Sequence, residues 1–243
     1  MVPPLIALEE HFDTKLFESD LLHDNLPAQL QDQLRDIGPH RIEALDAGKV
    51  SIQVLSHIGS VTPVKECIKS NDLLAAACRQ YPGRFAGFAQ LPMQDPEAAV
   101  AELERTIGEH GFVGALINNH CGDGTMYDDK KFWPVFEKAV SLDVPIYIHP
   151  VYPADNISGH YAGDFSQIAA VMLGTAGWGW HSETGLHILR LFASGLFDAF
   201  PDLKIVSFVA LPFSARCDLN VLILSGHWTY GRNAPLHARP DLP

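Results

Sequence analysis

Residues 5–12 read LIALEEHF, and this stretch decides between the fold classes that the rest of the chain allows. Its first half is apolar, as in a buried strand, and chemically active side chains gather at its end. No glycine-rich loop follows it, whereas a dinucleotide-binding fold places such a loop directly after its first strand. The stretch therefore favours a barrel over a doubly wound sheet.

Strand-like and helix-like segments alternate along the remainder of the chain. Further apolar, β-branched runs occupy residues 50–57, 84–91, 112–118, 144–149 and 204–209. Apolar residues at helical spacing occupy 64–80, 96–110, 130–142 and 183–193, and Asp95 before Pro96 is a typical helix start. The alternation predicts an α/β fold, a TIM-type (β/α)8 barrel in which parallel strands end at one rim.

The strand count is lower than a full barrel requires. A typical barrel has eight strands in about 250 residues, and only six candidates occur by residue 209. We expect a single barrel domain over residues 1–243, cut short after about six βα units, with 210–243 as an atypical C-terminal tail. Open sheet edges would make such a chain unstable or lead it to pair with itself, so a homo-oligomer is expected.

Composition excludes several classes of protein. The chain has 243 residues, 47% of them hydrophobic, and a formal net charge of −12, which opposes binding to nucleic acid. No apolar run approaches the length of a membrane span, and the acidic start does not resemble a signal peptide, so we expect a cytoplasmic protein without a membrane partner. The cysteines form no CxxC pair and are expected to be reduced: Cys67, Cys78, Cys121 and Cys217.

Metal-ligating residue types end the first and fifth predicted strands. Strand alternation points Glu9 and His11 to the same face and Glu10 to the opposite one. His149 ends an apolar run, where an imidazole needs a hydrogen-bond partner or a metal. Spacing alone leaves two alternatives open, a solvated strand end for Glu9 and His11 and a hydrogen-bonded core histidine for His149.

Several longer segments carry a family resemblance. In order along the chain they are ALEEHF, LDAGKVSIQVLSH, YPGRFAGFAQLPMQDPEAAVAELER, VPIYIHPVYP and ETGLHILRLFASGLFDAFPDLKIV. Together they span about residues 5–206 and resemble the amidohydrolase-2 family, which includes the γ-resorcylate, dihydroxybenzoate and salicylate decarboxylases and aminocarboxymuconate-semialdehyde decarboxylase. The specificity of the match lies in the order of the segments rather than in any one of them.

The resemblance implies a metal centre and a reaction. It makes Glu9, His11 and His149 ligands of one divalent metal ion. Zinc is the first choice because the ligands are a mixture of nitrogen and oxygen atoms, and manganese and magnesium are the alternatives. It implies non-oxidative decarboxylation of a hydroxylated aromatic carboxylic acid, a small-molecule substrate, in catabolism or secondary metabolism. The chain is accordingly expected to be a carboxy-lyase.

The chain departs from the family after the sixth predicted strand. The family continues there into a GHMGE-like motif with a catalytic histidine, and its eighth strand supplies an aspartate that binds metal and handles protons. This chain reads KIVSFVALPF instead, so no catalytic residue is assigned. Asp218 and His227 stand in the wrong context to replace them, and we expect impaired turnover. A gene-model error, a splice variant and an inactive paralogue remain alternative explanations.

Four further residues are candidate substrate contacts. His57 follows the second strand, and Asn118 ends the fourth in the run Asn118, Asn119, His120. Trp178 and Trp180 could enclose a planar ring. The alternatives are a hydrogen-bonded loop histidine, ordinary loop formers, and core or interface aromatics. Glu183 and His187 stand one helical turn apart, and without an HExxH partner motif they predict a surface or packing pair rather than a second metal site.

Two other functions stay open at this point. The same ion could activate water for hydrolysis of a lactone or an amide. Alternatively, the chain could be a non-catalytic barrel fragment that acts as a binding or oligomerisation partner. Release of CO₂, ring opening and metal content distinguish the three possibilities.

Overall fold

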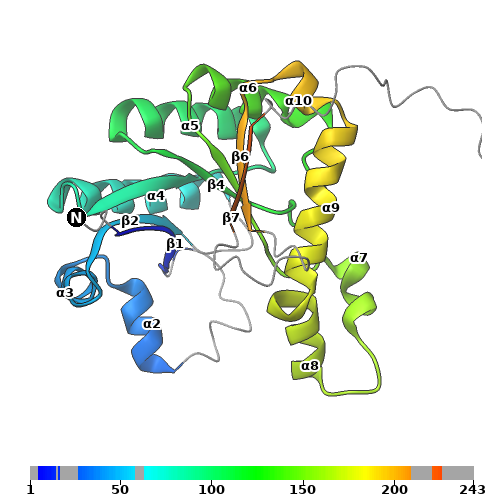
Figure 1. Ribbon diagram of the computed structural model, residues 1–243, viewed down its shortest axis with the longest axis horizontal. Coiled ribbons are helices and arrows are strands. Elements are labelled where there is room, and N and C mark those ends of the chain that lie inside the picture. The colour runs from blue at the N-terminus through cyan, green and yellow to red at the C-terminus, as the bar shows by residue number, and fades with distance from the viewer. Residues whose placement is uncertain (1–4, 15, 17–26, 58–62, 209–220, 226–243) are drawn as a thin grey trace, which may run out of the picture.

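A single curled sheet organises the protein. The computed structural model describes residues 5–14, 16, 27–57, 63–208 and 221–225. Its strands pair in chain order, and the first six are parallel and curl into half of a barrel (Figure 1). The strands are β1 (Leu5–Phe12), β2 (Val50–His57), β3 (Phe85–Gln90), β4 (Gly114–Asn118), β5 (Ile146–His149), β6 (Lys204–Phe208) and β7 (Val221–Ser225), which pairs antiparallel with β6.

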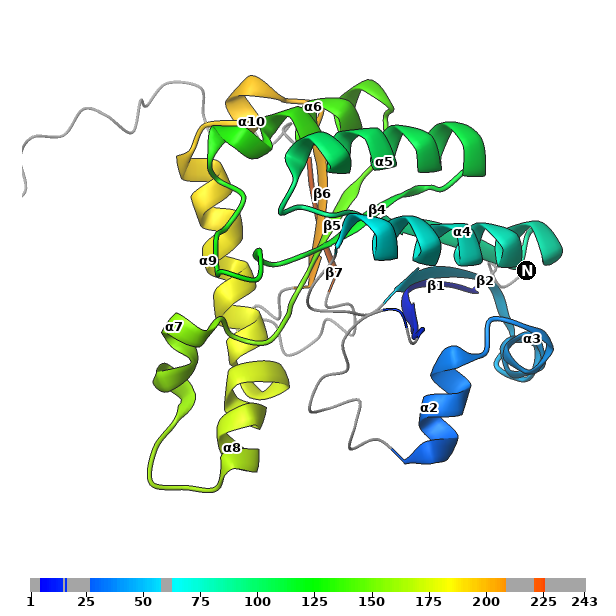
Figure 2. The same ribbon diagram turned by 180° about the vertical axis from the view of Figure 1, so that it is seen from behind.

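Helices connect the parallel strands and cover the outer face of the sheet. The main connecting helices are α4 (Val64–Gln80), α5 (Pro96–His110), α6 (Trp133–Ser141) and α9 (Gly179–Ala193). Figures 1 and 2 both show α2 and α3 across β1 and β2 from α4, and α7 and α8 beside one end of α9. The shorter elements are α2 (Ala28–Arg35), α3 (Pro39–Ala47), η1 (Lys130–Phe132), α7 (Asp155–Ser158), η2 (Gly159–Tyr161), α8 (Gln167–Met172), η3 (Leu173–Gly177) and α10 (Leu196–Ala199).

The two faces of the sheet carry separate apolar clusters. The larger cluster lies between the sheet and the helices and includes Leu55, Ala89 and Ile148. The smaller one lies on the inner, concave face and consists of Val54, Phe88, Leu116, Tyr147 and Val206, with Leu8 and Ala86 packed against it. Because successive strand residues alternate between faces, membership of a cluster tells which face each neighbouring residue lines.

Local sequence features fix the ends of the elements. The Asp95 side chain accepts a hydrogen bond from the Ala98 N–H, and Pro96 follows at the first helical position of α5, as the sequence predicts. Gly114 allows β4 to approach β5 closely, because a Cβ there would lie 2.6 Å from the carbonyl oxygen of Pro145. The β4–β5 pairing that this contact protects sets the position of His149.

The predicted half-barrel is confirmed, with differences in detail. Helices 64–80 and 96–110 and strands 5–12 and 50–57 have the predicted bounds. The strands β3, β4 and β5 are each two residues shorter than predicted, β6 is described as far as Phe208, and α9 begins earlier, at Gly179. The β7 strand was not predicted, and its antiparallel pairing differs from the all-parallel order of a barrel. Asp218, His227 and Cys217 lie outside the described residues. Among the helices that are described, none has the length and apolar character needed to cross a membrane.

Candidate metal centre

The three predicted metal ligands meet at the carboxyl-terminal rim of the half-barrel. Glu9 and His11 come from the end of β1 and His149 from the end of β5. His11 Nε2 and His149 Nε2 lie 3.1 Å apart, and Glu9 Oε1 lies 3.3 Å from His149 Nε2 and 4.0 Å from His11 Nε2. Within the described part of the chain, this is the only group of three or more such side chains whose ligand atoms come together.

The spacing of these three atoms fits a metal ion. The point equidistant from three atoms separated by 3.1, 3.3 and 4.0 Å lies about 2.1 Å from each of them. Bonds from zinc to imidazole nitrogen and carboxylate oxygen are about 2.0–2.2 Å long. The two imidazole nitrogens and the carboxylate oxygen therefore form a donor set of the right chemistry and size for a divalent ion.

A bulge in β1 brings Glu9 into this cluster. The β1–β2 register runs from Ala7 opposite Gln53 to Glu10 opposite Leu55, so β1 contains one more residue than β2 over this interval. Leu8 packs in the inner apolar cluster, and Glu9 still reaches the same side one residue later. The bulge thus allows Leu8 to pack in the inner apolar cluster while Glu9, the next residue, joins the two histidines on the same side of the sheet.

The protonation state of Glu9 suits a ligand. Burial alone would raise its pKa, but the hydrogen bond and charge of His149, with the hydrogen bond from Tyr147, outweigh burial and place the pKa below its ordinary value. The carboxylate is therefore ionised near neutral pH, with Oε1 facing the two histidines.

Ser56 orients the His11 ring. Ser56, at the end of β2, is buried, and its Oγ lies 3.0 Å from His11 Nδ1 and 3.5 Å from the Glu10 carbonyl oxygen. If the hydroxyl donates to that carbonyl, its oxygen accepts a hydrogen bond from Nδ1–H, which leaves the lone pair of Nε2 directed into the cluster. A second ring nitrogen held in this way is typical of metal-binding histidines.

Tyr147 is a site residue that the sequence reasoning missed. Its hydroxyl donates a hydrogen bond to Glu9 Oε2, and burial and then the negative charge of Glu9 raise the pKa of that hydroxyl, so it stays protonated. Tyr147 precedes His149 by two residues, and period-2 alternation puts both on the inner face. That spacing was the signal that could have found it.

We expect Tyr147→Phe to weaken metal binding about 10–100-fold, as is usual when a partner of a metal ligand is lost. The substitution keeps the ring in the inner cluster and removes only the hydroxyl that holds the Glu9 carboxylate. Affinity is measured by competition with a chromogenic chelator, using Tyr81→Phe at the end of α4 as the matched control. Unchanged affinity in Tyr147→Phe would remove Tyr147 from the site.

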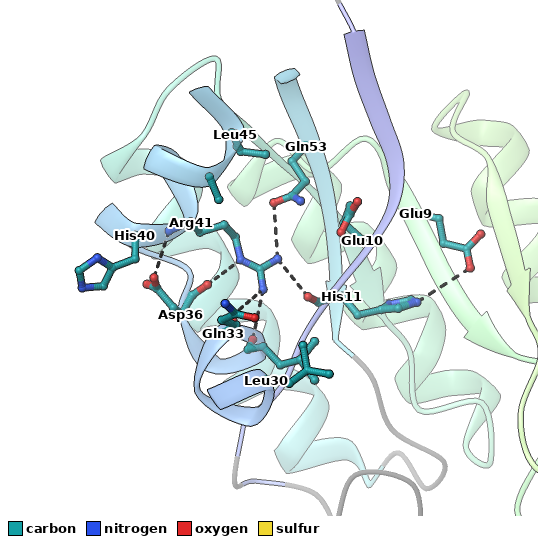
Figure 3. Close-up of a pocket in the computed structure, with 12 residues that line it drawn as sticks. Glu9, Glu10, His11, Leu30, Gln33, Asp36, His40, Arg41, Leu45 and Gln53 are labelled. Atoms are coloured by element: carbon teal, nitrogen blue, oxygen red, sulfur yellow. Dashed lines mark hydrogen bonds and ion pairs between the residues drawn. The ribbon is translucent and has the colours of Figure 1, made fainter. Parts of the chain in front are cut away.

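The opposite side of β1 faces a separate polar pocket. Figure 3 shows Glu10 on the side of Arg41 and Gln53, while Glu9 and His11 extend the other way, as alternation predicted. The pocket has a volume of about 490 Å³ and lies between β1 and helices α2 and α3. Arg41 donates to the carbonyl oxygen of His11 at 3.0 Å and so ties the end of β1 to these helices.

The candidate substrate contacts fall into different places. Asn118 is buried and pairs with His149 across β4 and β5, which puts it on the inner face beside this candidate metal ligand. His57 is buried, with its ring against Phe12 and its Nε2 3.0 Å from the Thr14 N–H nitrogen. Phe12 belongs to the larger apolar cluster, between the sheet and the helices, so His57 lies across the sheet from the three candidate metal ligands. Its substrate contact stays a prediction.

The two tryptophans lie where η3 passes into α9. Trp178 is 51% exposed, and Trp180 is partly buried. Their predicted role as an aromatic wall for a substrate ring stays a prediction. The Glu183 and His187 side chains have different hydrogen-bond partners: the Glu183 carboxylate accepts from Tyr161, and the fully buried His187 accepts from the Tyr127 N–H. Their packing against each other stays a prediction.

His187 holds the segment after β4 against α9. Its Nε2 accepts a hydrogen bond from the Tyr127 N–H at 3.0 Å, and its Nδ1 lies 3.2 Å from Asn119 Oδ1. Burial lowers the pKa of His187 to about 4, so the folded protein keeps this imidazole neutral. The unfolded chain binds a proton below pH ~6.5.

The stability of the protein is therefore expected to fall as the pH is lowered from ~6.5 to 4. In this window the unfolded state binds more protons than the folded state at His187, and the loss is on the order of 3 kcal/mol. Urea unfolding at pH 7 and pH 4.5 measures it, and His187→Gln should flatten the difference. An equal pH dependence in the variant would assign the effect to other groups.

Comparison with known proteins identifies the class to which this half-barrel and its ligand set belong. The amidohydrolase family model matches residues 32–207, and the chain belongs to this family. The decarboxylase orsB of Emericella nidulans is 45% identical over 219 residues, covering 85% of this chain and 65% of the relative. A γ-resorcylate decarboxylase of Polaromonas is 39% identical over 217 residues, covering 83% and 65%. The chain thus spans about 65% of the length of these relatives.

Solved structures give the same class. A dihydroxybenzoic acid decarboxylase from Polaromonas, with bound manganese and the inhibitor 2-nitroresorcinol, has a TM-score of 0.75 and 37% identity, covering 85% of this chain and 65% of that one. A 2,6-dihydroxybenzoate decarboxylase in complex with 2,6-dihydroxybenzoate also has a TM-score of 0.75, with 36% identity and coverage of 85% and 67%. The resemblance inferred from the sequence motifs is confirmed.

Proposed function

We propose that this protein is a metal-dependent, non-oxidative decarboxylase of a hydroxylated aromatic carboxylic acid. The observation that carries the proposal is the convergence of Glu9, His11 and His149 around a point with metal-ligand spacing. Two relatives that match most of this chain are named as decarboxylases, one of them as a γ-resorcylate decarboxylase. Two similar solved structures are of dihydroxybenzoate decarboxylases, one with bound manganese and one with the aromatic acid itself.

In this proposal the chain's residues hold and orient the reactants. Glu9, His11 and His149 bind Zn²⁺ or Mn²⁺. When bound, the ion supplies positive charge that attracts the carboxylate and the neighbouring hydroxyl of the acid. Asn118 lies beside His149 and can donate to or accept from a polar group of the ring, and Trp178 and Trp180 are the proposed aromatic contacts. The active species is a cytoplasmic homo-oligomer.

Proton transfer is the weak part of the proposed site. Decarboxylation leaves the electrons of the broken carbon–carbon bond on a ring carbon, which must take a proton. The family's histidine for this step has no counterpart in the sequence KIVSFVALPF, which stands where the GHMGE-like motif is expected. We therefore propose an impaired enzyme, because loss of a general acid or base commonly slows turnover about 10²–10⁴-fold.

The decisive experiment supplies 2,6-dihydroxybenzoate to protein loaded with Mn²⁺ or with Zn²⁺. The expected result is slow formation of resorcinol and CO₂, with resorcinol measured by chromatography. This formation should stop when the metal is removed and should be absent in His149→Ala. Metal-dependent ring opening of a lactone such as dihydrocoumarin, without CO₂ release, would favour a hydrolase. A chain that carries no stoichiometric metal yet forms defined oligomers would favour a non-catalytic binding protein.

A further inference from the structure

One buried side-chain amide on the inner face of the sheet has no hydrogen-bond partner among the residues that the structure describes. Gln90 is the last residue of β3 and is 1% exposed, yet neither its Oε1 nor its Nε2 has a hydrogen-bond partner within the described part of the chain. Leaving a buried amide unpaired is unfavourable, and such groups are rare in native proteins. An orphan of this kind calls for an explanation.

The backbone N–H and carbonyl groups of Gln90 are both hydrogen-bonded to one side chain. Asn71 on α4 accepts from the Gln90 N–H at 2.9 Å and donates to its carbonyl oxygen at 3.0 Å. Asn71 also donates to Glu102 at 2.7 Å, and Glu102 accepts two hydrogen bonds from Arg105 at 2.8 Å. The protein thus fixes the position of Gln90 with a satisfied polar network and leaves only the end of its side chain unpaired. Rigid support of this kind is what a binding residue needs.

The strand register directs this side chain to the metal side of the sheet. Gln90 is opposite Leu116, and Leu116 is opposite Tyr147; both belong to the inner apolar cluster, whereas Ala89 belongs to the outer one. Gln90 therefore shares the inner face and the row of Tyr147, whose hydroxyl binds Glu9. In addition, β3 is the middle strand of the arc from β1 to β5, the two strands that carry the ligands.

The chemistry of the amide indicates what it would bind. A glutamine side chain offers one acceptor and two donors and carries no charge. This pattern suits a phenolic hydroxyl, which both donates and accepts, better than a carboxylate, which needs positive charge. With the carboxylate and the adjacent hydroxyl of the acid at the metal, a second ring hydroxyl is the polar group left to recognise. We propose that Gln90 binds this second hydroxyl and selects dihydroxylated over monohydroxylated aromatic acids, an inference that rests on the proposed function.

Two inert probes that differ by one hydroxyl test this assignment. The probes are 2-nitroresorcinol and 2-nitrophenol, and binding to the Mn²⁺-loaded protein is followed by the absorbance of the nitrophenolate, so no turnover is required. The variant is Gln90→Leu, and the matched control is Gln80→Leu at the exposed end of α4. Metal content is determined in each preparation.

The native protein should bind 2-nitroresorcinol more tightly than 2-nitrophenol. Gln90→Leu should weaken binding of 2-nitroresorcinol about tenfold and that of 2-nitrophenol less than about threefold. Because Leu removes an unpaired buried amide, the urea midpoint of Gln90→Leu should also equal or exceed that of the native protein, whereas loss of a structural glutamine would lower it.

The possible failures are distinguishable. If native, metal-loaded protein binds neither probe, the proposed aromatic-acid site is wrong, and the role of Gln90 is overturned with it. If the native protein binds the probes but Gln90→Leu retains the same preference, or unfolds at a clearly lower urea concentration, the role of Gln90 alone is overturned and the proposed function stands.

Discussion

Replacing His149 with alanine is expected to weaken metal binding roughly a thousandfold or more. His149 is the only ligand that comes from β5, and its Nε2 is the atom closest to both other donors. Its loss leaves two donors from a single strand, which cannot surround an ion. The effect should exceed that of Tyr147→Phe, because a direct ligand is removed rather than its partner.

Isothermal titration with Zn²⁺ and Mn²⁺ measures this loss. The matched control is His40→Ala, since His40 is exposed on α3 and pairs only loosely with Glu43. Far-ultraviolet circular dichroism of the metal-free proteins checks that the fold is kept. Tight, stoichiometric binding by His149→Ala would show that the ion sits elsewhere.

Arg41→Met is expected to destabilise the fold by about 3 kcal/mol and to weaken metal binding as well. The guanidinium donates to the carbonyl oxygens of His11, Gln33, Leu34 and Asp36, at distances from 2.6 to 3.3 Å (Figure 3). Methionine retains most of the aliphatic packing but leaves these carbonyls without the donor. Because one of them belongs to His11, loosening this junction should move a ligand.

The control for this variant is Arg79→Met, an exposed arginine near the end of α4. Urea unfolding of both variants gives the difference in stability, and chelator competition gives the difference in metal affinity. If Arg41→Met lost stability but bound metal as the native protein does, the link between α3 and the end of β1 would be structural only.

Much of the fold followed from periodicity, because long parallel-sheet proteins alternate two clearly different patterns. The helices 64–80 and 96–110 are long and amphipathic, and Asp95 marks the start of the second, so their bounds agree with the structure. The short helices α7, α8 and α10 carry too few residues for a period to be recognised. The apolar run 221–225 had the composition of a strand, but nothing local indicated that it would pair antiparallel with β6.

The grouping of the three candidate metal ligands was predictable because these residues stand at recognisable places in strands. Alternation put Glu9 and His11 together and Glu10 apart, and the apolar run before His149 made that histidine conspicuous. The supporting residues could not be predicted so well. Tyr147 reads as an ordinary core aromatic until Glu9 is seen against it, and Gln90 becomes unusual only when its lack of a partner is known. These properties depend on the tertiary structure.

His57 shows that the rim at which a strand ends does not by itself fix the face that a side chain lines, and its substrate contact stays a prediction. It ends β2 at the same rim as the ligands, which made it a candidate contact, but the strand alternation turns its ring to the other face, towards Phe12 and Thr14. The neighbouring Ser56 is the residue of this pair that lines the inner face and reaches His11. The face of the strand that a residue occupies therefore matters as much as the end at which it stands.

A crystal of the Mn²⁺-loaded protein, measured at the manganese absorption edge, tests the central claim most directly. The account predicts one anomalous peak within about 2.0–2.3 Å of Glu9 Oε1, His11 Nε2 and His149 Nε2, between the ends of β1 and β5. A fully occupied peak at any other position, or none in protein that binds manganese in solution, would contradict it.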